Sequence, residues 1–132
     1  MKYLLDTCTV SDFVKGQAGV LARIKATPPS LISVSVITRM EIESGLQLNP
    51  DRARKLAPIL NDFLAAVTTL AFSEADAMAA AAIRAALQHQ GQPIGAYDTL
   101  IAGCGLARGL TVVTANTGEF QRVGGLLVEN WR

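Results

Sequence analysis

The sequence predicts an α/β fold in which helices cover both faces of a mainly parallel sheet of four to five strands. Short apolar runs alternate with longer segments whose apolar residues recur at helical spacing. The first run, Tyr3-Leu4-Leu5, is apolar at every position, as expected of a strand buried on both faces. A chain of 132 residues is long enough for one domain, which we expect to span residues 1–132.

Five segments have the composition of strands, and six helices are predicted around them. The strands are expected at residues 3–5, 31–34, 68–72, 110–114 and, at an edge, 126–128. The helices are expected at residues 9–15, 20–25, 36–46, 50–66, 74–91 and 96–108. Ser35 can cap the third helix, and Ser73-Glu74-Ala75-Asp76 has the form of a capping box. Pro58 indicates a kink or a boundary, and Gly103 leaves room for a neighbouring element to approach closely.

Composition excludes several classes of protein. Half of the residues are hydrophobic, and 12 Lys and Arg against 11 Asp and Glu give a formal charge of +1. This balance excludes a disordered tail and a strongly basic protein that coats nucleic acid. Residues 77–87 form the longest apolar stretch, which is too short to span a membrane, and the N-terminus does not resemble a signal peptide. We therefore expect a cytoplasmic protein with no membrane contact, whose two cysteines are reduced and act as small hydrophobic residues.

Four polar side chains are predicted to meet at one edge of the sheet. Asp6 ends the first strand, and Asn116 follows the fourth. Glu41 lies about two turns into the helix after the second strand, and Asp98 lies in the first turn of the helix at residues 96–108. Ligands of parallel sheets bind outside the carboxyl ends of the strands, so these residues form a candidate site.

The acids also have structural interpretations. Asp98 can compensate a helix dipole, and Glu41 can be a solvated residue on a helix surface. Asp6 is harder to explain in this way, because a carboxylate beside the core is costly unless it is paired or metal-bound.

Carboxylates are hard oxygen ligands that suit Mg²⁺ or Mn²⁺ rather than zinc. The sequence has no Ser/His/Asp or Cys/His arrangement for a nucleophile, and its one histidine, His89, lies at a polar helix end. No glycine-rich phosphate loop follows a strand. The remaining chemistry is metal-assisted hydrolysis, which fits cleavage of a phosphodiester.

Four blocks, in this order and spacing, resemble the PIN-domain ribonucleases and, among them, the VapC-type toxins of bacterial toxin–antitoxin pairs. The blocks are Leu4-Leu5-Asp6-Thr7, residues 35–42 with Gly45, Asp98-Thr99-Leu100-Ile101-Ala102, and residues 113–120 followed by Arg122-Val123 and Gly125-Leu126. Glu129-Asn130-Trp131 is also similar to the tail of the family. The likeness covers essentially the whole chain.

The resemblance implies a PIN-like three-layer fold and a Mg²⁺-dependent endoribonuclease, with Mn²⁺ as a substitute metal. Asp6 and Asp98 match the main metal ligands, and Glu41 matches a third acid that holds metal or water. Asn116 stands where many family members carry a fourth Asp, so a second metal should be held more weakly. Two further residues are expected to support these groups without binding metal themselves: Thr114 and Asp12.

Two residues near the motifs depart from the family pattern. Cys8 stands where many relatives carry Asn, and Glu119 is an extra acid expected to be a loop or cap residue rather than a ligand. Six cations are expected to flank the groove around the acids: Lys15, Arg23, Lys25, Arg39, Arg108 and Arg122.

The resemblance also implies partners. These are a homodimer, a VapB-like antitoxin whose C-terminal segment covers the active-site groove, and an RNA loop of tRNA or rRNA as substrate. Operator DNA would be contacted only through the antitoxin. Residues 52–66 and 75–87 carry more apolar residues than one small core needs, which favours surfaces buried by partners.

Three other functions stay open on the residues alone. A phosphatase of the haloacid-dehalogenase type needs a second Asp two residues after the first, where this chain has Cys8. A catalytically silent PIN-like module that only binds proteins would not need Asp6, Glu41 and Asp98 together. Cleavage of DNA uses the same metal chemistry and so is not distinguished.

Overall fold

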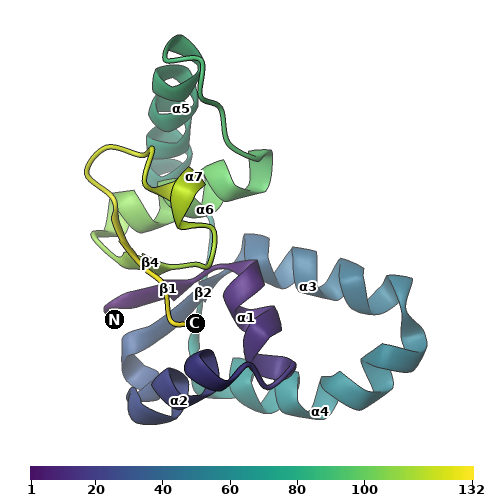
Figure 1. Ribbon diagram of the computed structural model, residues 1–132. Coiled ribbons are helices and arrows are strands. Elements are labelled where there is room, and N and C mark those ends of the chain that lie inside the picture. Colours follow the sequence, from purple (N-terminus) through teal and green to yellow (C-terminus); the bar gives the residue numbers. More distant parts are fainter.

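The computed structural model describes all 132 residues and contains a five-stranded sheet in which every neighbouring pair is parallel (Figure 1). The strand order is β3-β2-β1-β4-β5, so the first strand of the chain lies at the centre. The strands are β1 (Tyr3–Leu5), β2 (Ile32–Ser35), β3 (Thr68–Leu70), β4 (Thr111–Val113) and β5 (Leu127–Glu129). The predicted fold class and all five strands are confirmed.

Seven α-helices connect the strands. They are α1 (Thr7–Val14), α2 (Ala18–Ala26), α3 (Val36–Leu48), α4 (Pro50–Ala66), α5 (Glu74–His89), α6 (Ala96–Arg108) and α7 (Thr117–Phe120). Ser35 caps α3, and Ser73 with Asp76 forms the predicted capping box of α5. The short helix α7 and a 3₁₀ turn at Pro29–Leu31 were not predicted. None of the helices combines the length and the apolar character needed to cross a bilayer.

The predicted boundary at Pro58 is wrong, because α4 runs through this residue without a break. Proline removes one backbone hydrogen bond from a helix interior and clashes with the preceding turn. Beyond Pro58, α4 buries Leu60 and Phe63 in the core. We attribute the continuity of the helix to this packing, which offsets the local cost.

The sheet separates two apolar cores, as Figure 1 shows by the helices above and below it. Leu4 faces the core built with α5, α6 and α7, whereas Tyr3 and Leu5 face the core built with α1, α2 and α4. This alternation is the period of two that a strand imposes on its side chains. It explains why β1 is apolar at every position, and it leaves only the strand ends for polar chemistry.

Helices α5 and α6 approach each other closely at Gly103. A Cβ added to Gly103 would lie 2.8 Å from the backbone nitrogen of Ala80 and 2.8 Å from its Cβ. The close approach predicted from the sequence is therefore confirmed.

Residues 129–132 pack against α1, α2 and β1. The buried Trp131 ring lies edge-on to Tyr3 with 5.0 Å between ring centroids. Arg132 donates from Nε and Nη2 to the two carboxylate oxygens of Asp12, at 2.8 and 2.9 Å. Gly19 of α2 makes room for this tail, since a Cβ there would lie 2.6 Å from the carbonyl oxygen of Trp131. The tail thus ties α1 to the end of the sheet.

Candidate active site

Asp6 lies where β1 ends and α1 begins, and it is only 2% exposed. Its Oδ1 accepts from the backbone N–H of Thr9 at 2.9 Å, so Asp6 is the N-cap of α1. Burial raises the pKa of Asp6, while hydrogen bonds from Thr114 and Thr9 oppose the shift. The Thr9 hydroxyl also donates to the carbonyl of Val113 at 2.9 Å, which fixes this turn against β4.

Glu41 reaches the same edge from α3. The Thr7 hydroxyl, in the first turn of α1, donates to Glu41 Oε1 at 2.7 Å and lies 3.3 Å from the Thr38 hydroxyl. This contact joins the residue directly after Asp6 to the acid on α3. The interpretation of Glu41 as a freely solvated surface residue therefore does not fit the structure.

Asp98 lies in the first turn of α6 and is half-buried. Its pKa is raised to about 6, first by burial and then by the negative charges of Asp6, Glu119 and Glu41. A hydrogen bond from Asn116 partly lowers it. Three acids far apart in the sequence thus act on one carboxylate, which shows that the structure brings the predicted residues together.

Asn116 and Thr114 connect the acids to the end of β4. The Asn116 backbone N–H donates to the Thr114 hydroxyl at 2.9 Å, and the Asn116 side-chain amide donates to Glu119 Oε2. Glu119 lies on α7 and contributes negative charge to the cluster, although we expected it only at a loop or cap position. The spacing of three residues between Asn116 and Glu119 could have indicated that their side chains meet, since one helical turn brings such residues together.

One prediction about a single residue, Cys8, needs correction, and the surroundings of Asp12 are now defined. Cys8 as a residue is exposed rather than packed in the core, although its thiol is partly surrounded by protein; this partial desolvation, followed by the charges of nearby acids, raises the pKa of the thiol. It lies in the first turn of α1, whose inner face is taken by Thr9. Asp12 is bound by Arg132 and reaches Asp6 only through its charge.

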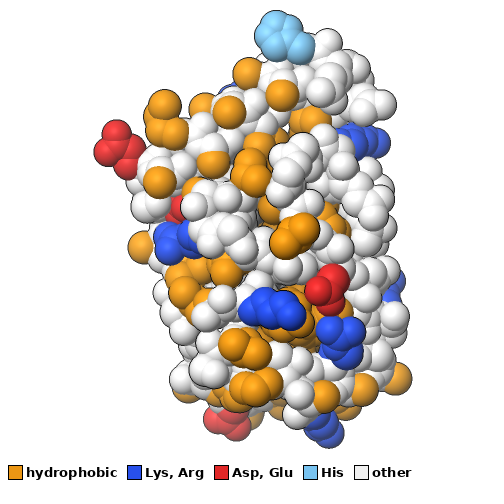
Figure 2. All heavy atoms as spheres, turned by 90° about the vertical axis from the view of Figure 1, so that its left-hand side faces the viewer, with side chains coloured by type: hydrophobic (Ala, Val, Ile, Leu, Met, Phe, Trp, Pro, Cys, Tyr) orange, Lys and Arg blue, Asp and Glu red, His pale blue; other side chains and the backbone are white.

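The predicted basic rim is smaller than expected. Arg23 pairs with Glu129 at 3.2 Å, and Arg108 pairs with the buried Asp76 at 3.1 Å, so neither is free. Lys15, in contrast, lines a cavity together with Glu41. Figure 2 shows a different side of the molecule, where β1 begins; there positive and negative side chains lie close together, with no continuous basic surface.

The side chains at this edge fit a hard divalent cation. Apart from Cys8, the donors are the oxygens of Asp6, Glu41, Asp98, Glu119 and Asn116, which is the ligand chemistry of Mg²⁺ and Mn²⁺. As the side chains stand, no three of them are arranged closely enough to form a ready ligand group. The negative charges of neighbouring acids help to raise the pKa of Asp98. A bound cation would offset this excess negative charge.

The raised pKa of Asp98 predicts that the stability of the metal-free protein depends on pH. A carboxyl whose pKa is about 6 in the folded chain and 3.8 otherwise stabilises the fold below pH 3.8 and loses that contribution as pH rises through 6. In the metal-free protein we expect Asp98→Asn to unfold like wild type near pH 4 and to be more stable at pH 7. The gain should be about 1 kcal/mol once solvent screening is allowed for. Urea unfolding of both proteins in EDTA measures it, and equal stability at pH 7 would contradict a pKa raised by burial and by the neighbouring acids.

Comparison with known proteins places the chain in a family. The PIN domain matches residues 3–126. The tRNA(fMet)-specific endonuclease VapC of Shigella flexneri is 36% identical over 99% of this chain and 98% of that protein. Ribonuclease VapC2 of Haemophilus influenzae is 34% identical over the same shares. The crystal structure of DNA-bound VapBC from Salmonella typhimurium superposes with a TM-score of 0.91 and 34% identity, covering 100% of this chain and 99% of that chain. The chain therefore belongs to the PIN-domain family and, within it, to the VapC ribonucleases.

Proposed function

We propose that this chain is a Mg²⁺-dependent endoribonuclease, acting in the cytoplasm as the toxin of a toxin–antitoxin pair through one PIN domain over residues 1–132. The observation that carries the proposal is the meeting of Asp6, Glu41 and Asp98 at the carboxyl edge of the sheet, where the negative charges of Asp6 and Glu41 help to raise the pKa of Asp98. The proposed substrate is an RNA loop of tRNA or rRNA, and relatives named as tRNA(fMet)-specific endonucleases support tRNA.

In this proposal each residue of the site has a role that follows from its position. Asp6 and Asp98 hold the metal, which when bound lowers the pKa of water and offsets phosphate charge. Glu41 holds metal or orients the attacking water, and the Thr7 hydroxyl fixes its carboxylate. Asn116 bonds to both Asp98 and Glu119, so its amide sets their spacing without adding charge. Thr114 holds Asp6 and the Asn116 backbone in place.

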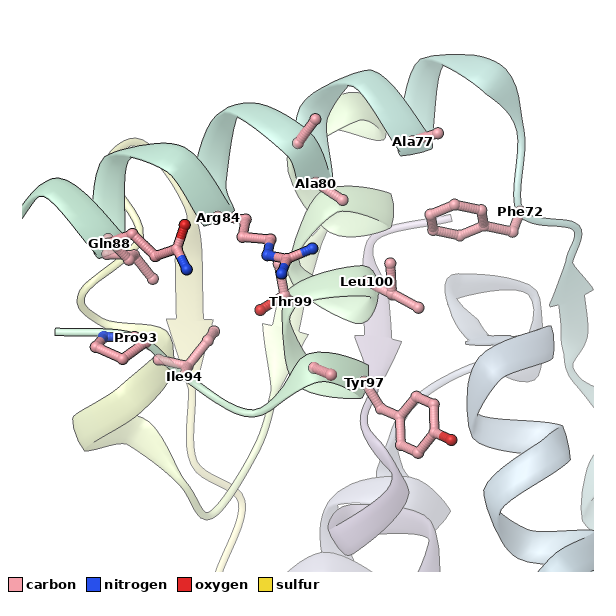
Figure 3. Close-up of a pocket in the computed structure, with 13 residues that line it drawn as sticks. Phe72, Ala77, Ala80, Arg84, Gln88, Pro93, Ile94, Tyr97, Thr99 and Leu100 are labelled. Carbon is pink, nitrogen blue, oxygen red and sulfur yellow. The ribbon is translucent and has the colours of Figure 1, made fainter.

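The partners are proposed on the same basis. The solved relatives include VapBC complexes bound to DNA, which supports a VapB-like antitoxin as the partner and inhibitor. In the proposal, operator DNA is contacted only through that antitoxin. A homodimer is supported by an apolar cleft of about 530 Å³ between α5 and α6, into which Arg84 points (Figure 3). Tyr97 at this cleft is 50% exposed, and Met78 on α5 is 67% exposed. A second copy would cover these side chains.

The test is a cleavage assay on the purified chain with total tRNA and rRNA. We expect discrete cuts with Mg²⁺ or Mn²⁺, none in EDTA, and recovery when Mg²⁺ is added back. Light scattering of the same sample is expected to give the mass of a dimer. Cleavage that persists in EDTA would contradict the metal mechanism, and no cleavage with any metal would favour a module that only binds proteins.

A further inference from the structure

A second cavity, of about 200 Å³, opens beside Glu41 between α1, α3 and α4. Thr7, which follows Asp6 directly, and its hydrogen-bond partner Glu41 line one end, which we call the inner end because it lies next to the acid cluster. Its sides are apolar and include Val14, Ile42 and Leu46. Its outer rim is polar and carries Lys15, Asn49 and Arg52. We call this cavity the α1/α3/α4 pocket.

The two cations of the rim are unpaired. Arg23, Arg54, Arg108 and Arg132 each form an ion pair, and neither Lys15 nor Arg52 does. The pocket therefore combines a negative inner end, apolar sides and an outer rim with two free positive charges. This arrangement fits a ligand whose phosphate contacts the two cations of the rim and whose apolar face packs on the sides of the pocket.

The geometry of α1 sets the distance between the two ends. Asp6 caps the start of α1 and Lys15 is its C-terminal cap, so the rim lies about 14 Å along the helix axis from the acids. A phosphodiester cut at the acids is therefore not the phosphate that the rim can contact. The rim would contact a neighbouring phosphate of the same strand.

We infer that the α1/α3/α4 pocket binds a nucleotide that flanks the cleaved bond of a single-stranded RNA loop. Its base packs on the apolar sides, and Lys15 and Arg52 contact its phosphate. Single-stranded loops offer unstacked bases to such pockets, and phosphate contacts add salt-dependent affinity. The inference rests on the proposed ribonuclease function and names where the substrate lies beyond the acids.

The test compares two double variants that remove the same charge. Lys15→Gln with Arg52→Gln alters the rim, and Lys2→Gln with Lys55→Gln removes two cations that form no ion pair and do not line the pocket. The probe is an RNA hairpin carrying the anticodon stem and loop of tRNA(fMet), cleaved by the full chain with Mg²⁺ at several salt concentrations. Thermal unfolding of both variants confirms that they fold.

For the rim variant we expect KM to rise about tenfold with kcat unchanged, because contacts away from the cleaved bond contribute uniform binding. The slope of log affinity against log salt should fall by about 0.7, since Lys15 and Arg52 contact one phosphate and each neutralised single-strand phosphate accounts for about 0.7 of that slope. The control variant should change KM less than about twofold.

Three outcomes would overturn the inference. The rim variant could keep the KM and salt slope of wild type while Asp98→Asn is inactive. That result would agree with the ribonuclease function but would show that the pocket does not bind the RNA. Loss of antitoxin binding alone would make the pocket a protein-docking site. A wild-type chain that cleaves no RNA would overturn this inference together with the proposed function.

Discussion

Replacement of Asp98 by Asn is expected to lower RNA cleavage by about 10³-fold or more while the fold stays intact. Asn keeps the size of the side chain and removes the charge that a divalent cation needs. Asp98 is the carboxylate on which Asp6, Glu119 and Glu41 all act, so its loss should disable metal binding most directly. The measurements are single-turnover cleavage with saturating Mg²⁺, and growth inhibition after induction in cells.

The matched control is Asp51→Asn, because Asp51 also lies in the first turn of a helix, α4, but is exposed and distant in the sequence from the acids. If Asp98 served only to compensate a helix dipole, both variants would keep full activity and lose about 0.3–1 kcal/mol of stability. A fully active Asp98→Asn protein would overturn the assignment of this site.

Replacement of Gly103 by Ala is expected to lower the free energy of unfolding by about 1–3 kcal/mol, as overpacking of a well-filled core does. The added Cβ would lie 2.8 Å from the Ala80 nitrogen and 2.9 Å from its Cα. These are backbone atoms of α5, so α5 and α6 must separate to accept the methyl group. Urea unfolding with an unchanged m-value measures the loss.

Gly45 provides the control for this change. It also lies inside a helix, α3, but nothing lies within 4 Å of a Cβ added there. Gly45→Ala should therefore stabilise the protein by up to about 1 kcal/mol through helix propensity alone. If Gly103→Ala behaved in the same way, α5 and α6 would not be in the close contact described.

The features that the sequence predicted correctly depend on local rules. Apolar runs and caps located the strands and most helix ends, as the agreement at α6 and at the capping box of α5 shows. The meeting of Asp6, Glu41 and Asp98 followed from one topological rule, that the carboxyl ends of parallel strands share an edge.

The features that it missed depend on tertiary contacts or on very short elements. Arg23 and Glu129 are 106 positions apart in the chain, and no local pattern could show that they pair. Glu119 was undervalued because α7 has only four residues, too few to show helical periodicity. The sequence indicates Asp6 only as a strand end, yet it also caps α1, which begins at Thr7, two residues before the predicted helix start.

The strand order also determines when, during synthesis, the protein can become active. β1 is made first, but it lies between β2 and β4, and β4 is among the last elements to be made. Until Val113 emerges from the ribosome, the backbone N–H of Asp6 and the hydroxyl of Thr9 both lack their acceptor. Asn116 and Glu119 emerge later still. The proposed site is therefore incomplete until residues 111–119 have been made, so the three strands and six α-helices that precede them do not form it on their own.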